Sequence, residues 1–214
     1  MSADRYDLIV LGTGPAASTV ARKVKEAGRR VAIIEKREFG GTCALRGCNP
    51  KKVYTNAGAL IEQVRRGEKQ LIRTDNPRIV WSDLLEFKRQ FTEPVLKKSE
   101  SGFQEDGIDT YHGAPRFTGH REIALDDRRL AAEKFLIAVG SRPITLDVPG
   151  ERFLTHSDDF LELEQMPQRV VFVGGGYISM EFAHAVARYG SEVTVVERGP
   201  RILESFDPHL GEQL

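Results

Sequence analysis

The sequence predicts an α/β fold in which two parallel-sheet units each bind a dinucleotide, and two observations support it. Residues 6–35 are typical of a strand, a tight glycine turn, a helix and a second strand. Residues 170–197 repeat the same order of elements late in the chain. Continuous apolar strands joined through a helix are typical of a parallel sheet that is buried on both faces.

The two copies also agree in spacing, which indicates an internal duplication of one βαβ unit. Glu35 lies 21 residues after Gly14, and Glu197 lies 21 residues after Gly176. In both copies the acidic residue ends the second strand. Two unrelated glycine clusters would not share this count, so we interpret both as mononucleotide-binding units.

The remaining elements follow from hydrophobic periodicity and from the turn residues. Residues 108–139 contain short alternating runs between turns, which favours an antiparallel meander. We expect one domain over residues 1–149 and the first part of a second over residues 150–214. The expected strands are 6–11, 31–34, 170–173 and 193–196, and the expected helices are 16–27, 42–66, 82–103, 158–163 and 177–189.

Composition excludes several classes of function. The chain carries 31 basic and 31 acidic residues, so its charge gives no reason to expect a nucleic-acid or membrane partner. No run of apolar residues has the length of a signal peptide or a membrane span, and we therefore expect a cytoplasmic location. The two cysteines are too few for a secreted disulfide scaffold. No histidine lies near them at ligand spacing, so we expect no metal.

The first glycine turn has the chemistry of a pyrophosphate site. In Gly12-x-Gly14-x-x-Ala17 the first glycine permits the turn, the second admits the phosphates and the small third residue lets the helix pack on the strand. The helix N-terminus offers unpaired N–H groups and a positive dipole end to the anion. Glu35 is placed to accept hydrogen bonds from a ribose hydroxyl.

The second turn, Gly174-x-Gly176-x-x-Ser179, follows the same logic with Glu197 as its ribose acid. Two dinucleotide sites in one chain indicate two cofactors, or one cofactor and one dinucleotide substrate. This combination indicates electron transfer.

The cysteine pair follows shortly after the first ribose acid. On an ideal helix, Cys43 and Cys48 would have Cα atoms about 8–9 Å apart, beyond the roughly 7 Å limit for a disulfide. A bridge therefore needs a distorted first turn, which Gly47 and Pro50 would permit. A strained, accessible disulfide is easily reduced. The helix start and Lys51 would favour the thiolates. The alternative is two unrelated buried thiols.

These pieces together resemble the FAD-dependent pyridine nucleotide–disulfide oxidoreductases, a family that includes glutathione reductase, dihydrolipoamide dehydrogenase and mercuric reductase. The most specific stretch runs from Gly40 to Lys52 and contains both cysteines. The resemblance implies two Rossmann-like domains, an FAD domain with an antiparallel meander followed by an NAD(P) domain that is incomplete in this sequence. It also implies a homodimer and a small disulfide or dithiol substrate of the glutathione or lipoamide type.

The resemblance assigns roles to individual residues. Cys48 is expected beside the flavin, and Cys43 is expected to attack the substrate disulfide. Lys51 and Glu181 are expected to pair near flavin N5, and Tyr177 to cover the flavin until the nicotinamide displaces it. The expected cofactor-binding residues are Gly12, Gly14, Pro15, Ala16, Glu35, Gly41, Thr42, Ala114 and Gly140 for FAD, and Gly174, Gly175, Gly176, Ile178, Glu197 and Arg198 for the nicotinamide dinucleotide.

Some positions depart from the family pattern or leave a choice open. Val139 replaces a usual threonine, Asn49 a usual aliphatic residue, and Arg46 is an unusual neighbour for the disulfide. An acid at Glu197 repels a 2′-phosphate and favours NAD over NADP, although Arg198 aligns with a phosphate-binding arginine of glutathione reductase.

The family also needs a C-terminal domain that supplies dimer contacts and a His–Glu acid–base pair, and none of the five histidines has that context. We therefore expect a truncated chain. One alternative function is a flavin-binding fragment or redox sensor without steady turnover. Another is a flavin monooxygenase or peroxide-reducing flavoprotein, against which the cysteine pair weighs.

Overall fold

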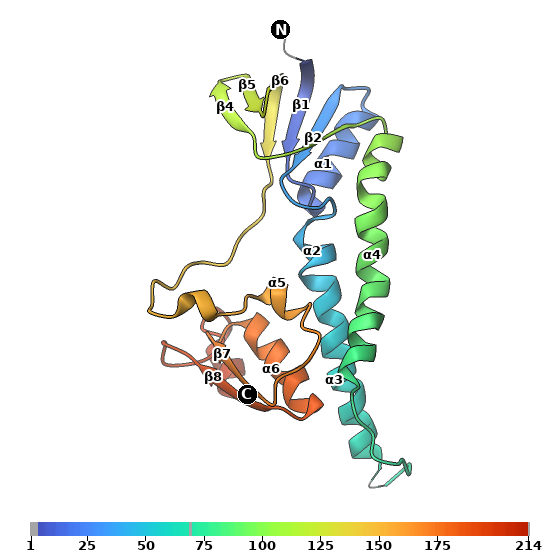
Figure 1. Ribbon diagram of the computed structural model, residues 1–214, viewed down its shortest axis with the longest axis vertical. Helices are drawn as coiled ribbons and strands as arrows, with labels where there is room; N and C mark the ends of the chain where they lie inside the picture. The colour runs from blue at the N-terminus through green and yellow to red at the C-terminus, as the bar shows by residue number, and fades with distance from the viewer. Residues whose placement is uncertain (1–3, 69, 214) are drawn as a thin grey trace. The chain divides into compact units, whose positions relative to one another are not determined.

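The structure is a computed structural model that describes residues 4–68 and 70–213. The chain groups into two compact units, and Figure 1 shows the helices and strands from which they are built. The first unit contains the residues up to Asn49 together with Phe91–Leu154, and the second contains Pro50–Gln90 and the residues from Thr155 onward. Residues 50–90 thus group with the C-terminal part of the chain. The domain boundary near residue 149 stays a prediction.

The first unit is built on a six-stranded sheet in the order β3-β2-β1-β6-β5-β4. β1 (Asp4–Leu11) pairs in parallel with β2 (Val31–Glu35), and α1 (Pro15–Glu26) connects them. β2 pairs in parallel with β3 (Asp109–His112), and β1 pairs in parallel with β6 (Arg128–Ile137) on its other side. The sheet is therefore predominantly parallel, as expected for a Rossmann-like dinucleotide-binding domain.

The antiparallel meander is shorter than the sequence indicated. It consists of β4 (Arg116–Gly119), β5 (Glu122–Leu125) and β6. The run at Asp109–His112 was expected in the meander, but it forms β3 at the edge of the parallel part. Because β3 is an edge strand, none of its side chains is fully buried, and it lacks the continuous apolar sequence of the buried parallel strands β1 and β2.

Both faces of β1 and β2 are buried, which explains their continuous apolar sequence. Ile9 and Leu11 belong to one core cluster, while Leu8 and Val10 belong to the cluster on the opposite face. Full burial of such a side chain contributes roughly 1.5–3 kcal/mol. The two strands are thereby held rigidly, with their carboxyl ends at the same edge as the glycine turn.

The expected helix over residues 42–66 is interrupted. α2 (Gly41–Leu45) ends at Leu45 with Arg46 as its C-cap, and α3 (Cys48–Gly67) begins directly after Gly47. A Cβ atom at Gly47 would lie 3.0 Å from the carbonyl oxygen of Thr42. This contact is tighter than ordinary van der Waals contact, so glycine avoids crowding at the interruption. The long helix α4 (Trp81–Glu105) matches the helix expected over residues 82–103.

The second unit contains a two-stranded parallel sheet. β7 (Arg169–Val173), α6 (Tyr177–Tyr189) and β8 (Glu192–Val196) form one βαβ unit with Val170 opposite Val193. Its aromatic core includes Trp81 and Phe182. The short elements of the chain are the 3₁₀ helix Glu151–Phe153, α5 (Ser157–Phe160) and α7 (Pro208–Glu212).

Within the described residues, no helix combines the length and the apolar character that crossing a bilayer requires.

Candidate functional site

The turn after β1 has the backbone of a phosphate-binding turn. Gly12 has φ +103°, and its N–H donates to the carbonyl of Ile34 at 2.8 Å. A Cβ atom there would lie 2.3 Å from the carbonyl oxygen of Ala138. Only glycine can therefore occupy this position. The residues that follow enter α1 with Gly14 as N-cap and Pro15 in the first turn, and no side chain caps the helix.

Gly14, the second glycine of the turn, is closely packed against Gly41 on one side and open on the other. A Cβ atom at Gly41, whose φ is +74°, would lie 2.4 Å from the Cα atom of Gly14. The start of α2 is thus packed directly on the turn. A Cβ atom on Gly14 itself would meet no atom within 4 Å. The space above this peptide is open, as close approach of a pyrophosphate requires.

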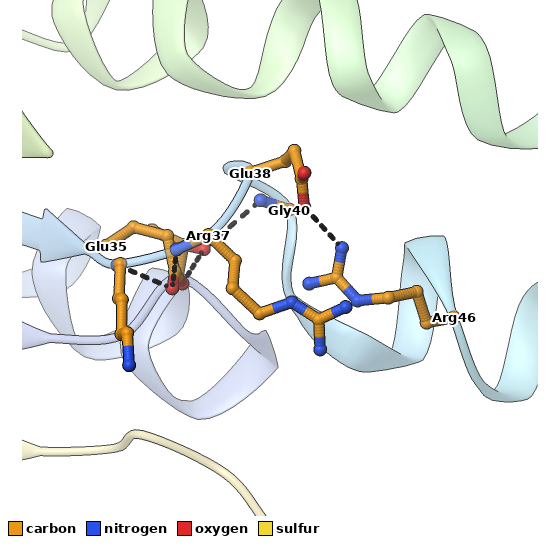
Figure 2. A network of polar contacts seen from close by, with 7 residues as sticks. Glu35, Arg37, Glu38, Gly40 and Arg46 are labelled. Carbon is orange, nitrogen blue, oxygen red and sulfur yellow. Dashed lines mark hydrogen bonds and ion pairs between the residues drawn. The ribbon is translucent and has the colours of Figure 1, made fainter. Parts of the chain in front are cut away.

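Glu35 is held by three donors of the chain, and Figure 2 shows its carboxylate beside the backbone of Arg37. Its Oε2 accepts a hydrogen bond from Thr13 Oγ1 at 2.7 Å. Its Oε1 accepts from the backbone N–H groups of Lys36 and Arg37 at 2.9 and 3.0 Å. An ionised carboxylate offers about four lone-pair sites. The fixed carboxylate therefore keeps capacity to accept a ribose hydroxyl.

Thr13 connects this carboxylate to the segment before α2. It is buried at 3% exposure, and its hydroxyl oxygen also accepts from the N–H of Gly40 at 3.2 Å. Thr13 was not among the expected binding residues, because it occupies a variable position of the glycine motif. Its hydroxyl could have indicated a role, because the motif requires only a small residue at this position and not a polar one.

The turn, the acid and the start of α2 surround one cavity of about 610 Å³. The nine residues expected to bind FAD all line it, and so does Cys43. The lining residues are Leu11, Gly12, Thr13, Gly14, Pro15, Ala16, Ile34, Glu35, Lys36, Arg37, Gly41, Thr42, Cys43, Arg46, Gly113, Ala114, Pro115, Ala138, Val139, Gly140, Ser141 and Arg142.

The cavity carries more positive than negative charge. Among its lining residues Glu35 is the single acid, whereas the cations are Lys36, Arg37, Arg46 and Arg142. Open backbone at a helix N-terminus together with this surplus fits the pyrophosphate of a dinucleotide. The residues of this cavity therefore fit FAD. The arginines were not among the expected binding residues.

The two cysteines lie on either side of the interruption between α2 and α3. Cys43 is partly buried and lines the cavity, whereas Cys48 is exposed at the first position of α3. The described residues contain no disulfide bond. The expected distortion between the cysteines is present as the break at Arg46 and Gly47. Their roles stay a prediction.

The second unit repeats the geometry of the first turn. Gly174 has φ +99°, and its N–H donates to the carbonyl of Val196 at 2.8 Å. This is the same bond at the same distance as in the first copy. Gly176 is the N-cap of α6, with φ −76° and ψ 169°, close to the values of −68° and −179° at Gly14.

In the β7–α6–β8 unit, backbone N–H groups hold the Glu197 carboxylate. Its carboxylate accepts from the N–H of Gly175 at 2.5 Å and from the N–H of Gly199 at 2.7 Å. These bonds, led by that of Gly199, lower the pKa of this carboxyl below its ordinary range. Gly175 thus takes the position that Thr13 has in the first copy. A Cβ atom at Gly175 would lie 2.8 Å from Ile202 and 3.1 Å from the Glu197 carboxylate.

The three residues expected beside the flavin ring come together in the second unit. Lys51 Nζ forms an ion pair with Glu181, and it also lies 4.5 Å from the ring centroid of Tyr177. Lys51 is largely shielded from solvent, while Tyr177 is half exposed. Ile178 is 37% exposed and Arg198 is exposed. The lysine is thus fixed by a carboxylate and an aromatic ring.

Comparison with known proteins agrees with this arrangement. Residues 6–214 match the pyridine nucleotide-disulphide oxidoreductase family. The chain is 30% identical to a mercuric reductase of Staphylococcus aureus, with 98% of the chain and 39% of the relative covered. It is 29% identical to a glutathione reductase of Nostoc sp., with 98% and 46% covered. It is also 29% identical to a dihydrolipoyl dehydrogenase of Mycoplasma pneumoniae, with 97% and 47% covered. The chain thus spans less than half the length of these relatives.

Proposed function

Because the chain belongs to the pyridine nucleotide-disulphide oxidoreductase family, we propose that it passes electrons from a nicotinamide dinucleotide through FAD to a disulfide formed by Cys43 and Cys48. The observation that carries this proposal is the single cavity of about 610 Å³ around the first glycine turn. It gathers all nine residues expected to bind FAD together with Cys43.

The FAD site is assigned to the first unit. The N–H groups at the start of α1 face the pyrophosphate, since no side chain caps them and the peptide at Gly14 is open. Glu35, fixed by Thr13 and two backbone N–H groups, accepts the ribose hydroxyl. When bound, FAD accepts a hydride from the nicotinamide and releases an electron pair to the disulfide.

The nicotinamide dinucleotide is assigned to the turn between β7 and α6. Its pyrophosphate lies at Gly174, Gly175 and Gly176, and Glu197 accepts its ribose hydroxyls. The two N–H groups that hold Glu197 favour its ionised form, and a fixed negative charge repels a 2′-phosphate. We therefore favour NAD over NADP. Arg198, which aligns with a phosphate-binding arginine of glutathione reductase, is the residue that supports the alternative of NADP.

The electron balance of the cycle is simple. NADH supplies two electrons and one proton as hydride, and the solvent supplies a second proton. The bond between the two sulfur atoms breaks, and each sulfur becomes a thiol. Cys48 is the sulfur on the flavin side. Cys43 then attacks one sulfur of a small disulfide substrate and forms a mixed disulfide, so that one half of the substrate leaves as a thiol. Cys48 attacks the Cys43 sulfur of this mixed disulfide, which releases the other half as a second thiol and restores the Cys43–Cys48 bond. Lys51, oriented by Glu181, supplies positive charge where the hydride arrives. Tyr177 covers the flavin until the nicotinamide displaces its ring.

The substrate class is a disulfide or dithiol of the glutathione or lipoamide type. The complete protein is proposed to be a cytoplasmic homodimer whose remaining part supplies the acid–base pair for Cys43. The alternative is a flavin-binding redox sensor without steady turnover, and family membership over residues 6–214 does not favour it.

Anaerobic titration of the FAD-loaded protein with NADH and NADPH tests the proposal. We expect a long-wavelength absorption band from a thiolate stacked on flavin, reached with less NADH than NADPH. The band is lost in Cys48→Ser and retained in Cys43→Ser. A protein that binds FAD and is reduced by NADH without any such band contradicts the disulfide route.

A further inference from the structure

We propose that Phe206, in the segment after β8, is a positioning residue that holds the Tyr177 ring in the place from which the nicotinamide displaces it. This inference rests on the proposed function, in which Tyr177 covers the flavin. It names the contact against which the nicotinamide works, and it assigns a role to a half-exposed aromatic side chain that neither glycine turn requires.

The Tyr177 ring lies beside the lysine of the proposed hydride-transfer site. Tyr177 is the first residue of α6, directly after the N-cap Gly176. Lys51 Nζ lies 4.5 Å from the centroid of its ring, a distance at which a cation and an aromatic face attract each other. Lys51 is itself fixed by its ion pair with Glu181. Because Lys51 is proposed to supply charge where the hydride arrives, the ring beside it is in the covering position.

A second aromatic ring contacts Tyr177 in this position. The ring centroids of Tyr177 and Phe206 are 6.4 Å apart, and the ring planes are inclined by 60°. This is the edge-to-face arrangement that aromatic pairs prefer. The two residues are 51% and 50% exposed. Since neither is enclosed in a core, the contact with one neighbouring ring changes the balance between the positions that the Tyr177 ring can take.

The backbone around Phe206 is fixed by hydrogen bonds. The N–H of Leu203 donates to the carbonyl of Gly175 at 2.8 Å, and the N–H of Phe206 donates to the carbonyl of Leu203 at 2.8 Å. The Arg201 guanidinium donates to the carbonyls of Glu204 at 2.9 Å and of Phe206 at 3.4 Å. Leu203 has φ +53°, a conformation that leucine adopts only where its surroundings impose it. The segment is thus tied to the second glycine turn, and it presents the Phe206 ring from a fixed backbone.

A purely structural role for Phe206 makes a different prediction, and this allows a sharp test. If Phe206 only packs its segment against α6, its removal loosens the second glycine turn and weakens every ligand of that turn. If Phe206 holds the Tyr177 ring in the covering position, its removal frees the ring. The nicotinamide then displaces the ring more easily, so NADH binds more tightly. A dinucleotide without the nicotinamide is not affected.

Stopped-flow reduction of the FAD-loaded protein by NADH measures the limiting rate and the NADH concentration that gives half of it. We expect Phe206→Ala to lower the half-saturating NADH concentration roughly threefold, a size typical of one exposed aromatic pair. The limiting rate should stay unchanged, because the ring moves before the hydride is transferred. Phe206→Tyr keeps an aromatic ring and should behave as the parent.

Two controls separate this effect from a general loosening of the chain. ADP-ribose lacks the nicotinamide, and as a competitor of NADH it should bind Phe206→Ala with the parental affinity. Phe117 is also 50% exposed, and its ring lies 5.0 Å from that of Phe135 in the first unit. Phe117→Ala should change neither the limiting rate nor the half-saturating NADH concentration.

Two further readouts report on the Tyr177 ring itself. Iodide should quench the fluorescence of oxidised flavin more strongly in Phe206→Ala than in the parent, because a freed ring covers the flavin for a smaller part of the time. In a Tyr177→Ala background, Phe206→Ala should have no further effect on iodide quenching or on the half-saturating NADH concentration, since the two residues act through one contact.

The inference is overturned if Phe206→Ala leaves the half-saturating NADH concentration unchanged or raises it. It is also overturned if the affinity for ADP-ribose changes together with that for NADH, or if the effect of Phe206→Ala persists without the Tyr177 ring. Such results leave the proposed function intact. A parent protein that binds FAD and is not reduced by NADH contradicts the proposed function itself and removes the basis of this inference with it.

Discussion

Thr13 Oγ1 and Glu35 Oε2 are joined by a 2.7 Å hydrogen bond across 22 residues of sequence. The bond links the glycine turn after β1 to the acid at the end of β2. The same hydroxyl accepts the N–H of Gly40, next to the start of α2. One buried side chain thus holds together the three segments that surround the cavity.

Thr13→Val tests this link, because valine has nearly the same shape and no hydroxyl. The change leaves Glu35 Oε2 and the Gly40 N–H without this partner, and we expect the free energy of unfolding to fall by roughly 1–3 kcal/mol. Urea denaturation measures it. Thr13→Ser should retain most of the stability. Thr118→Val, at an exposed threonine that also bonds a glutamate, should change it by less than about 0.5 kcal/mol. Equal effects at both threonines would contradict the argument.

Gly14→Ala separates binding from folding. The added methyl meets no atom of the protein, and φ at this residue is −68°, which alanine adopts freely. We therefore expect normal stability together with at least roughly tenfold weaker FAD binding, since the methyl occupies the space of the pyrophosphate. Gly41→Ala should instead destabilise the fold, because its methyl collides with Gly14. Unchanged FAD affinity in a folded Gly14→Ala protein would place the pyrophosphate elsewhere.

Lys51→Met tests the ion pair with Glu181. The loss of its charge should slow the reduction of bound flavin by NADH about tenfold or more, which corresponds to about 1.4 kcal/mol in the barrier. Stopped-flow absorbance at the flavin band gives the rate. The neighbouring Lys52 is exposed and provides the matched control as Lys52→Met. If both variants keep the parental rate, Lys51 has no part in hydride transfer.

His184 predicts a pH dependence of stability. Burial, and then the charge of Arg188, lower its pKa in the folded chain, while Glu62 acts in the opposite direction. The unfolded chain therefore binds the proton first as the pH falls below about 6.5. The contribution of neutral His184 to stability is fully present above about pH 6.5. It declines as the pH falls from that value through the pKa of His184 in the folded chain. Urea unfolding at about pH 7.5 and about pH 5.5 measures the free energy of unfolding that is lost between these pH values. The loss should be smaller in His184→Gln than in the parent. In His120→Gln, a change at an exposed position, it should equal that of the parent. Identical losses of unfolding free energy in the parent and both variants would contradict a contribution of His184 to the pH dependence.

The strongly periodic parts of the fold could be predicted from the sequence. Helix α6 has the expected bounds, and the strands after which both glycine turns occur are where the apolar runs place them. β3 was assigned to the wrong part of the sheet, because this edge strand has no fully buried side chain and therefore lacks the continuous apolar run of a buried parallel strand. The break between α2 and α3 has no periodic signal. Only the distance that a disulfide imposes on Cys43 and Cys48 indicated a distortion there.

The candidate site was predictable to a similar degree. Glycines with positive φ and the two strand-end acids follow from motif spacing, because those positions have a single physical solution. Thr13 and Arg46 lie at variable positions within the motifs. Thr13 bonds Glu35, 22 residues away, and Arg46 bonds Glu38, 8 residues away. Sequence spacing does not reveal these contacts.

The count of reactive thiols before and after reduction tests the central claim most directly. The chain has two cysteines. We expect the oxidised, FAD-loaded protein to show almost no thiol toward a thiol-specific reagent under denaturing conditions, and about two per chain after anaerobic reduction with NADH and removal of the nicotinamide. Cys43→Ser and Cys48→Ser should each show one thiol in both states. Two thiols per chain both before and after reduction would show that no disulfide accepts electrons from the flavin.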